Sequence, residues 1–185
     1  LTLANLVSAT IDAFDRIDIL VNAHRMVQPC DPMTVTEDLL GDMLRENMMS
    51  GLRLSQMVAK RMVAQAEESS SPALQNGAIV NVSSLAANWP NPTMLAYSIS
   101  SAAQAQATRS LAAALAPKRI RVNGVAFASI MSNILQQKLR EDASLRDRMI
   151  AATPLGRIAG ADELAATVQF LASDASAFVT GQILS

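Results

Sequence analysis

The sequence predicts an α/β fold built on a doubly wound parallel sheet, of which these 185 residues form part. Short runs of apolar, often β-branched residues alternate along the chain with longer stretches that carry apolar residues at helical spacing. The short runs do not alternate apolar and polar residues, as a strand with one solvent-exposed face does. We therefore expect strands that helices cover on both faces, in right-handed βαβ units. No repeat, low-complexity segment or linker interrupts the chain, and we expect residues 1–185 to form a single domain.

The first half of the chain is expected to begin with a helix and a buried strand. Its predicted elements, in order, are a helix (3–14), a strand (17–21), a long amphipathic helix (36–65) and a polar loop (67–72). The pattern Thr34-x-x-Glu37 resembles a capping box and is expected to begin the long helix.

The second half repeats the alternation of strands and helices. Its predicted elements are a strand (78–82), a helix (97–116), a strand (120–126), a charged helical stretch (133–150), a helix (162–172) and a last strand (180–184). Pro117 is expected to stop the second long helix, because proline cannot donate a helical hydrogen bond.

Composition argues against several classes of function. The net charge is −1 and the basic residues are scattered, so we expect no nucleic-acid surface. Cys30 is the only cysteine, which leaves no disulfide and fits a reducing cytoplasm best. No apolar run reaches the roughly 18 residues of a membrane span. His24 is the only histidine and no ligand motif accompanies it, so we expect no metal site.

In a doubly wound sheet, ligands bind beyond the carboxyl ends of the strands. That rule selects Asn22-Ala23-His24, Ser83–Ser84 and the stretch 127–132, together with Tyr97 at the start of a helix. Ser84 and Tyr97 are 13 residues apart, and a hydroxyl at a strand end can converge with a phenol at a helix start to transfer a proton. No glycine-rich phosphate turn such as GxGxxG occurs in the sequence.

These segments, in this order, resemble the short-chain dehydrogenase/reductase family over nearly the whole chain. The matching stretches are IDILVNA (17–23), ENMMSGLRLSQ (46–56), IVNVSS (79–84), IRVNGVA (120–126) and residues 153–182. The resemblance implies a Rossmann-like fold and an NAD- or NADP-dependent enzyme that acts on a carbonyl or alcohol substrate.

The resemblance also implies roles for individual residues. Tyr97 would give or take the proton, Ser84 would hold the substrate oxygen and Asn47 would organise a water relay. The positions expected on the cofactor side are Asn22, Ala23, His24, Phe127, Ala128 and Ser132.

Three residues depart from the family pattern, all on the cofactor side. Ser101 stands four residues after Tyr97, where the family has a lysine whose ammonium favours tyrosinate and anchors the cofactor. His24 replaces a glycine and is expected to crowd the close approach of backbone and cofactor. Phe127-Ala128 replaces a Pro-Gly pair. We expect impaired chemistry, and binding of no cofactor is the alternative.

Members of the family normally begin with two further βα units that carry the dinucleotide turn. Two such units need about 60 residues, whereas one helix precedes the first predicted strand here. We expect the sequence to be a fragment rather than a shortened protein, because a half-wound sheet exposes an apolar strand edge.

Two functions follow from the resemblance. The first is an NAD(P)-dependent oxidoreductase, and the second is a catalytically silent homologue that acts by assembly. The family commonly forms dimers and tetramers through the two long helices, here residues 36–65 and 97–116. Restoring lysine at Ser101 is expected to raise the rate if the chain is a weakened enzyme.

Overall fold

The structure of the protein is a computed structural model, and it describes residues 2–69, 75–89 and 91–185. Four parallel strands form one sheet in the order β1 (Ile19–Asn22), β2 (Gly77–Ser84), β3 (Ile120–Phe127) and β4 (Ile183–Leu184). The predicted parallel α/β sheet is therefore confirmed. Residues 70–72 of the predicted polar loop lie outside the described residues.

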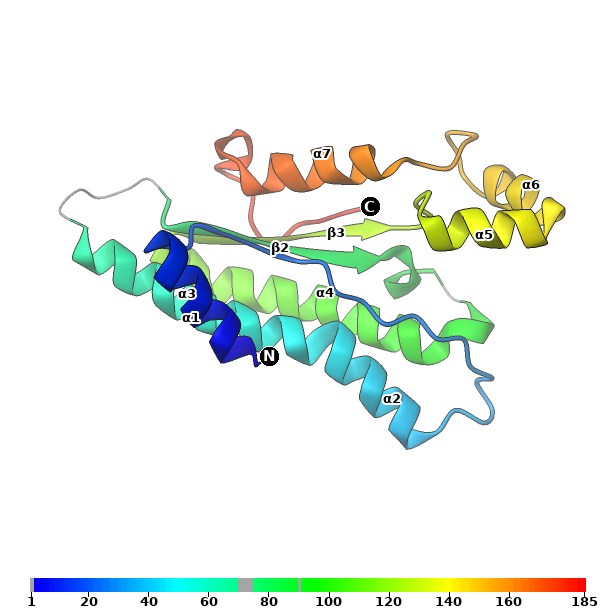
Figure 1. Cartoon of the computed structure of the whole chain (residues 1–185), viewed down its shortest axis with the longest axis horizontal. Helices are drawn as coiled ribbons and strands as arrows, with labels where there is room; N and C mark the ends of the chain where they lie inside the picture. Colours follow the sequence, from blue (N-terminus) through cyan, green and yellow to red (C-terminus); the bar gives the residue numbers. More distant parts are fainter. Residues whose placement is uncertain (1, 70–74, 90) are drawn as a thin grey trace.

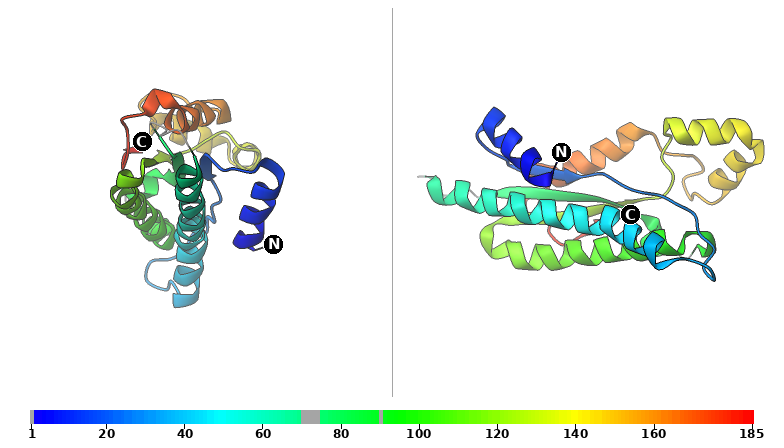
Figure 2. Two further views of the ribbon diagram at one scale, coloured as in Figure 1. Left: turned by 90° about the vertical axis from the view of Figure 1, so that its left-hand side faces the viewer. Right: turned by 60° about the horizontal axis from the view of Figure 1, so that its bottom comes forward.

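Helices cover both faces of this sheet (Figures 1 and 2). The helices are α1 (Leu3–Phe14), α2 (Glu37–Leu44), α3 (Ser50–Glu68), α4 (Leu95–Leu115), α5 (Asn133–Glu141), α6 (Ala143–Ala151) and α7 (Ala161–Ala172). The helices α3 and α4 lie on one face and α7 lies on the other, as βαβ units require (Figure 1). No helix in the described part of the chain is long and apolar enough to cross a membrane.

Each face of the sheet has its own apolar core. On the α3 and α4 side, Val58 and Met62 pack against Ile79 and Val122, and all four side chains are buried. On the α7 side, the fully buried Leu171 packs over Val80 and Val125 of the neighbouring strands. Successive strand residues thus serve opposite cores, which explains why β2 and β3 are buried along nearly their whole length instead of alternating between buried and exposed residues.

Strand β1 departs from the prediction that it is buried on both faces. Ile19 is 51% exposed and Val21 is 41% exposed, whereas Leu20 packs against the core beneath α3. The difference arises because α7 lies across β2 and β3, and no described helix covers the face of β1 that bears Ile19 and Val21.

The long helix predicted over residues 36–65 is present but not uniform. It runs through α2, a π-helical turn η1 (Arg45–Met49) and α3 without leaving helical backbone conformation. Its N-cap is Thr36, whose Oγ accepts from Leu39 N at 3.2 Å, so the capping box at Thr34 was a wrong prediction. The π-helical turn contains Asn47, one of the predicted site residues.

The remaining differences concern element ends. The charged stretch 133–150 is two helices, because Asp142 leaves helical geometry and caps α6 by accepting from the backbone N–H groups of Ser144 and Leu145. Pro117 lies in a short 3-10 helix, η4 (Ala116–Lys118), that ends α4 as predicted. The last strand extends over two residues only.

Candidate active site

The predicted site residues come from different elements that meet at one edge of the sheet. Asn22, Ser84 and Phe127 are the last residues of β1, β2 and β3, and Ser84 lies opposite Phe127 in the register. Because the strands are parallel, their carboxyl ends share this edge. Tyr97 lies in the first turn of α4, which contacts both β2 and the short 3-10 helix η2 (Leu85–Ala87) that follows Ser84.

Tyr97 is held by a cation that the sequence analysis did not identify. Its side chain is almost fully buried, and its phenol oxygen accepts a hydrogen bond of 3.1 Å from Nε of Arg25. The guanidinium carbon of Arg25 lies 5.0 Å from the centre of the phenol ring, within cation–π distance. Arg25 comes from the loop that follows β1, 72 residues before Tyr97.

The other donors of Arg25 fix the guanidinium in place. Nη1 donates to the carbonyl oxygen of Val82 at 2.8 Å and to Oε1 of Gln104 at 3.0 Å. Nη2 donates to Oγ of Ser101 at 2.8 Å. All of these partners are uncharged, and no carboxylate pairs with Arg25 in the described part of the chain.

Ser101 is fully buried one helical turn after Tyr97, at the position where the family carries its lysine. Its hydroxyl is a hydrogen-bonding partner of Arg25. Gln104 follows three residues later on the same face of α4 and binds the same guanidinium. The predicted absence of a positive group beside the phenol is therefore wrong, since Arg25 places one there from another element.

Ser84 is buried at the end of β2, where it caps η2. Its Oγ accepts from the backbone N–H of Ala86 at 3.2 Å. Among the described residues, no hydrogen bond joins Ser84 to Tyr97 and none accepts the Ser84 hydroxyl proton. The structure thus brings the two hydroxyls to the same edge without pairing them.

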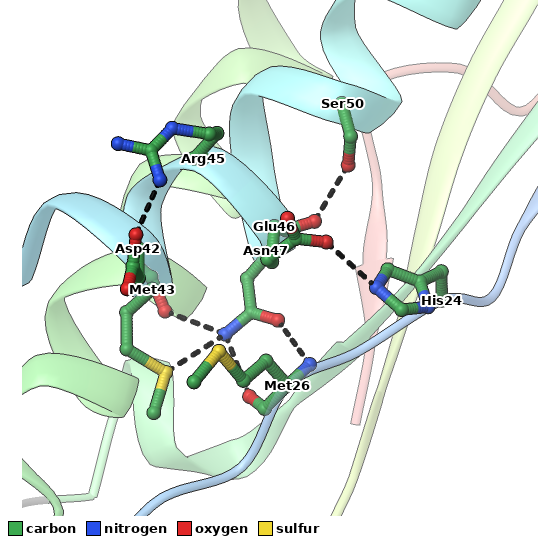
Figure 3. A network of polar contacts seen from close by, with 9 residues as sticks. His24, Met26, Asp42, Met43, Arg45, Glu46, Asn47 and Ser50 are labelled. Carbon is green, nitrogen blue, oxygen red and sulfur yellow. Dashed lines mark hydrogen bonds and ion pairs between the residues drawn. The ribbon is translucent and has the colours of Figure 1, made fainter. Parts of the chain in front are cut away.

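Asn47 is 1% exposed and clamps the loop that carries Arg25 (Figure 3). Its Oδ1 accepts from Met26 N at 2.7 Å, and its Nδ2 donates to Met26 O at 2.9 Å. The same Nδ2 donates to Oγ of Ser100 on α4 at 3.0 Å. The π-helical turn directs this amide between the loop and α4.

Asn22 is also buried, and its amide faces the interior. Nδ2 donates to Oδ1 of Asn81 at 2.8 Å and to Oγ of Ser55 at 3.0 Å. Asn81 in turn donates to Oγ1 of Thr108 at 2.8 Å, so polar groups join α3, the sheet and α4. These contacts give Asn22 a structural role beneath the site.

Ala23 and His24 are exposed beyond the end of β1. The imidazole Nε2 of His24 lies 3.0 Å from Oε2 of Glu46, on the outside of the loop (Figure 3). The expected crowding of the approach between backbone and cofactor by this imidazole stays a prediction. A cavity of about 340 Å³ lies beside these residues, lined by Asn22, Asn47 and Gly51 among others.

The predicted residues at the end of β3 and just beyond it differ in burial. Phe127 is half-buried and packs against the core beneath α7, while Ala128 is exposed. Ser132 is exposed and caps α5, with its Oγ accepting from Leu135 N at 3.2 Å. Within the described residues, no hydrogen bond joins any of the three to Tyr97.

Sequence reasoning missed Arg25 and Gln104. The available signal was the position of Arg25, which directly follows Asn22-Ala23-His24 at the end of a strand. Ligands bind at this edge of a parallel sheet, so an arginine there is a candidate site residue. The search for a cation considered only the helix of Tyr97, whereas the observed cation reaches it from the preceding βα loop.

Known proteins resemble this chain over its whole length. The family described as Enoyl-(Acyl carrier protein) reductase matches residues 2–185. The 3-oxoacyl-(acyl-carrier-protein) reductase of Thermotoga maritima is 33% identical over 178 residues, covering 96% of this chain and 68% of the relative. The L-rhamnose 1-dehydrogenase (NAD(P)(+)) of Azotobacter vinelandii is 32% identical over 179 residues, covering 97% of this chain and 66% of the relative.

Solved structures agree with these sequence relatives. A gluconate 5-dehydrogenase from Burkholderia cenocepacia, in complex with NADP and tartrate, superposes with a TM-score of 0.86 at 28% identity, over 98% of this chain and 68% of that one. A 7 alpha-hydroxysteroid dehydrogenase, complexed with NADH and 7-oxo glycochenodeoxycholic acid, gives a TM-score of 0.87 at 30% identity, over 98% of this chain and 67% of that one. The chain belongs to the short-chain dehydrogenase/reductase family of oxidoreductases.

Proposed function

We propose that the protein is an NAD(P)-dependent oxidoreductase that interconverts a small-molecule carbonyl and its alcohol. The observation that carries the proposal is the Tyr97 phenol, which stands at the ligand-binding edge of the sheet with its oxygen bonded to a cation. The relatives support the reaction class, since each of the dehydrogenases named above acts by oxidoreduction.

In this proposal Tyr97 gives its proton to the carbonyl oxygen during reduction and takes a proton from the alcohol during oxidation. Ser84 donates its unpaired hydroxyl proton to the same substrate oxygen and so holds the substrate in register with the phenol. Asn47 has both amide hydrogens bound by its neighbours, which supports a role in holding the loop. The Oδ1 atom of Asn47 can accept one further hydrogen bond, and a water of the relay implied by the family would donate it.

The cofactor bound at this edge supplies the hydride acceptor or donor. We assign the cofactor side to Asn22, Ala23, His24, Phe127, Ala128 and Ser132. The cavity beside Asn22 and His24 suits the adenosine half of a dinucleotide, and the exposed hydroxyl of Ser132 suits the carboxamide of its nicotinamide. The sequence contains no glycine-rich phosphate turn, so the fit that we propose for these residues leaves out the pyrophosphate.

Cofactor binding and turnover test the proposal together. Calorimetry with NADH and NADPH is run on this protein, followed by assays with a panel of ketones and alcohols. Tyr97→Phe should lower kcat by about 10²- to 10⁴-fold while the cofactor Kd changes little, because the phenyl ring keeps the packing. Absence of both binding at millimolar cofactor and turnover contradicts the proposal.

A catalytically silent subunit is the second candidate, and one feature favours it. The outer face of α4 leaves Ile99 40% exposed and continues through the exposed Ala102 and Gln106, a surface on which two copies can pack helices closely. We propose a homodimer or tetramer through helices 36–65 and 97–116. Ala102→Glu should dissociate it in sedimentation velocity, while Ala165→Glu on α7 should not.

We assign the protein to the cytoplasm under both proposed functions. The support is the cysteine content, since Cys30 is the only cysteine and is unpaired.

A further inference from the structure

We propose that Arg25 takes over the work of the family's lysine: anchored by Ser101, its guanidinium orients the Tyr97 phenol and stabilises the charge that develops on its oxygen. The inference rests on the proposed oxidoreductase function and deepens it. It makes Arg25 a positioning residue, because it acts on the substrate through Tyr97.

The hydrogen bond between the two side chains has only one possible direction. Arginine carries five N–H donors and no acceptor, so Nε donates into a lone pair of the Tyr97 oxygen at 3.1 Å. The phenol proton is not used in this bond and stays available to a substrate. The guanidinium therefore fixes the phenol oxygen while leaving its O–H free for transfer.

No carboxylate within residues 2–69, 75–89 and 91–185 pairs with the charge of Arg25. Its hydrogen-bond partners are the phenol of Tyr97, the hydroxyl of Ser101, the amide of Gln104 and the carbonyl of Val82. A half-buried cation surrounded by neutral dipoles stabilises an anion beside it much more than a solvated cation does. The atom placed to receive that stabilisation is the phenol oxygen as its proton leaves.

Arg25 and Ser101 form a matched pair. Nη2 lies 2.8 Å from the Ser101 hydroxyl, so the guanidinium occupies the space into which a lysine at position 101 would extend. A second cation there would face like-charge repulsion in a buried setting. The small side chain of Ser101 leaves room for the guanidinium, and its hydroxyl oxygen accepts a hydrogen bond from it. An arginine that extends from the loop after β1 needs both properties.

The surrounding structure holds Arg25 in this position. Both backbone groups of the next residue, Met26, are bonded to the buried side-chain amide of Asn47: its N–H donates to Oδ1, and its carbonyl oxygen accepts from Nδ2. Gln104 and the end of β2 hold Nη1. The guanidinium is thus fixed before substrate arrives, as electrostatic stabilisation of a developing charge requires.

The first test reads the contact without any turnover. Tyr97 is the only tyrosine, so protein made with tyrosine labelled at the 13Cζ carbon gives one ring signal by NMR. Arg25→Met should move that signal, because the carbon bears the oxygen that loses its donor. Arg140→Met, which removes an exposed arginine on α5, should leave it in place. Identical signals in the parent and Arg25→Met overturn the inference.

The second test supplies the cation from α4 instead of from the loop after β1. Arg25→Met should lower kcat by about 10²-fold or more, with a much smaller change in KM. Arg25→Met/Ser101→Lys should recover at least ten-fold of that loss, whereas Ser101→Lys alone should lower the rate. Unchanged kcat in Arg25→Met, or no recovery in the double variant, overturns the inference.

The outcomes separate this inference from the proposed function. A parent protein without turnover, but with the expected NMR difference, defeats the oxidoreductase proposal and the catalytic part of the inference together. A parent with turnover that is lost in Tyr97→Phe, but is unaffected in Arg25→Met, defeats the inference alone.

Discussion

Replacing Asn47 by alanine tests whether the π-helical turn is what holds the site together. The side chain is 1% exposed and makes hydrogen bonds to Met26 N, Met26 O and Ser100 Oγ at 2.7, 2.9 and 3.0 Å. Alanine removes all of them and leaves partly buried backbone groups unpaired. At about 1 kcal/mol net for each bond, the free energy of unfolding should fall by about 3 kcal/mol.

Urea unfolding followed by circular dichroism at 222 nm measures this loss. Asn47→Asp is the graded variant, because a carboxylate keeps the acceptor for Met26 N but loses both donors. Asn5→Ala on α1 is the matched control, since Asn5 is exposed and its side chain makes no hydrogen bond within the described residues. If Asn47→Ala costs less than about 1 kcal/mol, or no more than Asn5→Ala, the amide does not clamp the loop and the reasoning is wrong.

Two further predictions concern stability away from the site. Arg121 is 6% exposed and donates to Leu171 O at 2.8 Å and Ser173 O at 3.0 Å, so Arg121→Met should cost about 3 kcal/mol in urea unfolding and speed hydrogen exchange at the end of α7. A hydrogen bond from Arg157, then the N–H of Gly160, lowers the pKa of Glu163 from 4.5 to about 2. A carboxylate whose pKa is depressed by folding stabilises the protein above its unfolded pKa, and this stability is lost as pH falls toward about 2. Glu163→Gln should therefore lower Tm at pH 6 and match the parent near pH 2, and an equal Tm difference at both pH values would contradict this.

The parallel sheet could be predicted because strands covered on both faces leave a clear sequence signal. The apolar runs of β2 and β3 need no partner information to be recognised. The exposure of Ile19 and Val21 could not be predicted in this way, because burial depends on which helix crosses the strand. The π-helical turn at Arg45–Met49 has no sequence pattern of its own, since it is decided by the contacts of Asn47.

The placement of Ser84 and Tyr97 at one edge of the sheet was predictable, whereas the electrostatic surroundings of the phenol were not. The spacing of Ser84 and Tyr97 places both hydroxyls at one edge of the sheet without any knowledge of packing. The partner of Tyr97 is 72 residues away in the chain, and its arrival depends on the path of the loop after β1. A missing lysine at position 101 therefore indicated a lost charge, whereas the fold supplies a charge from a different element.

Chemical rescue of an arginine deletion tests the central claim most directly. In Arg25→Gly the space of the guanidinium is open, and carbonyl reduction is measured while guanidinium chloride is added below its denaturing concentration. Urea has nearly the same planar shape and two of the three amino groups but no charge, so it is the matched control. We expect guanidinium to raise kcat with saturation, urea to leave it unchanged, and Tyr97→Phe to respond to neither. Equal effects of guanidinium and urea, or no rescue by guanidinium, would contradict a role for the Arg25 charge beside Tyr97.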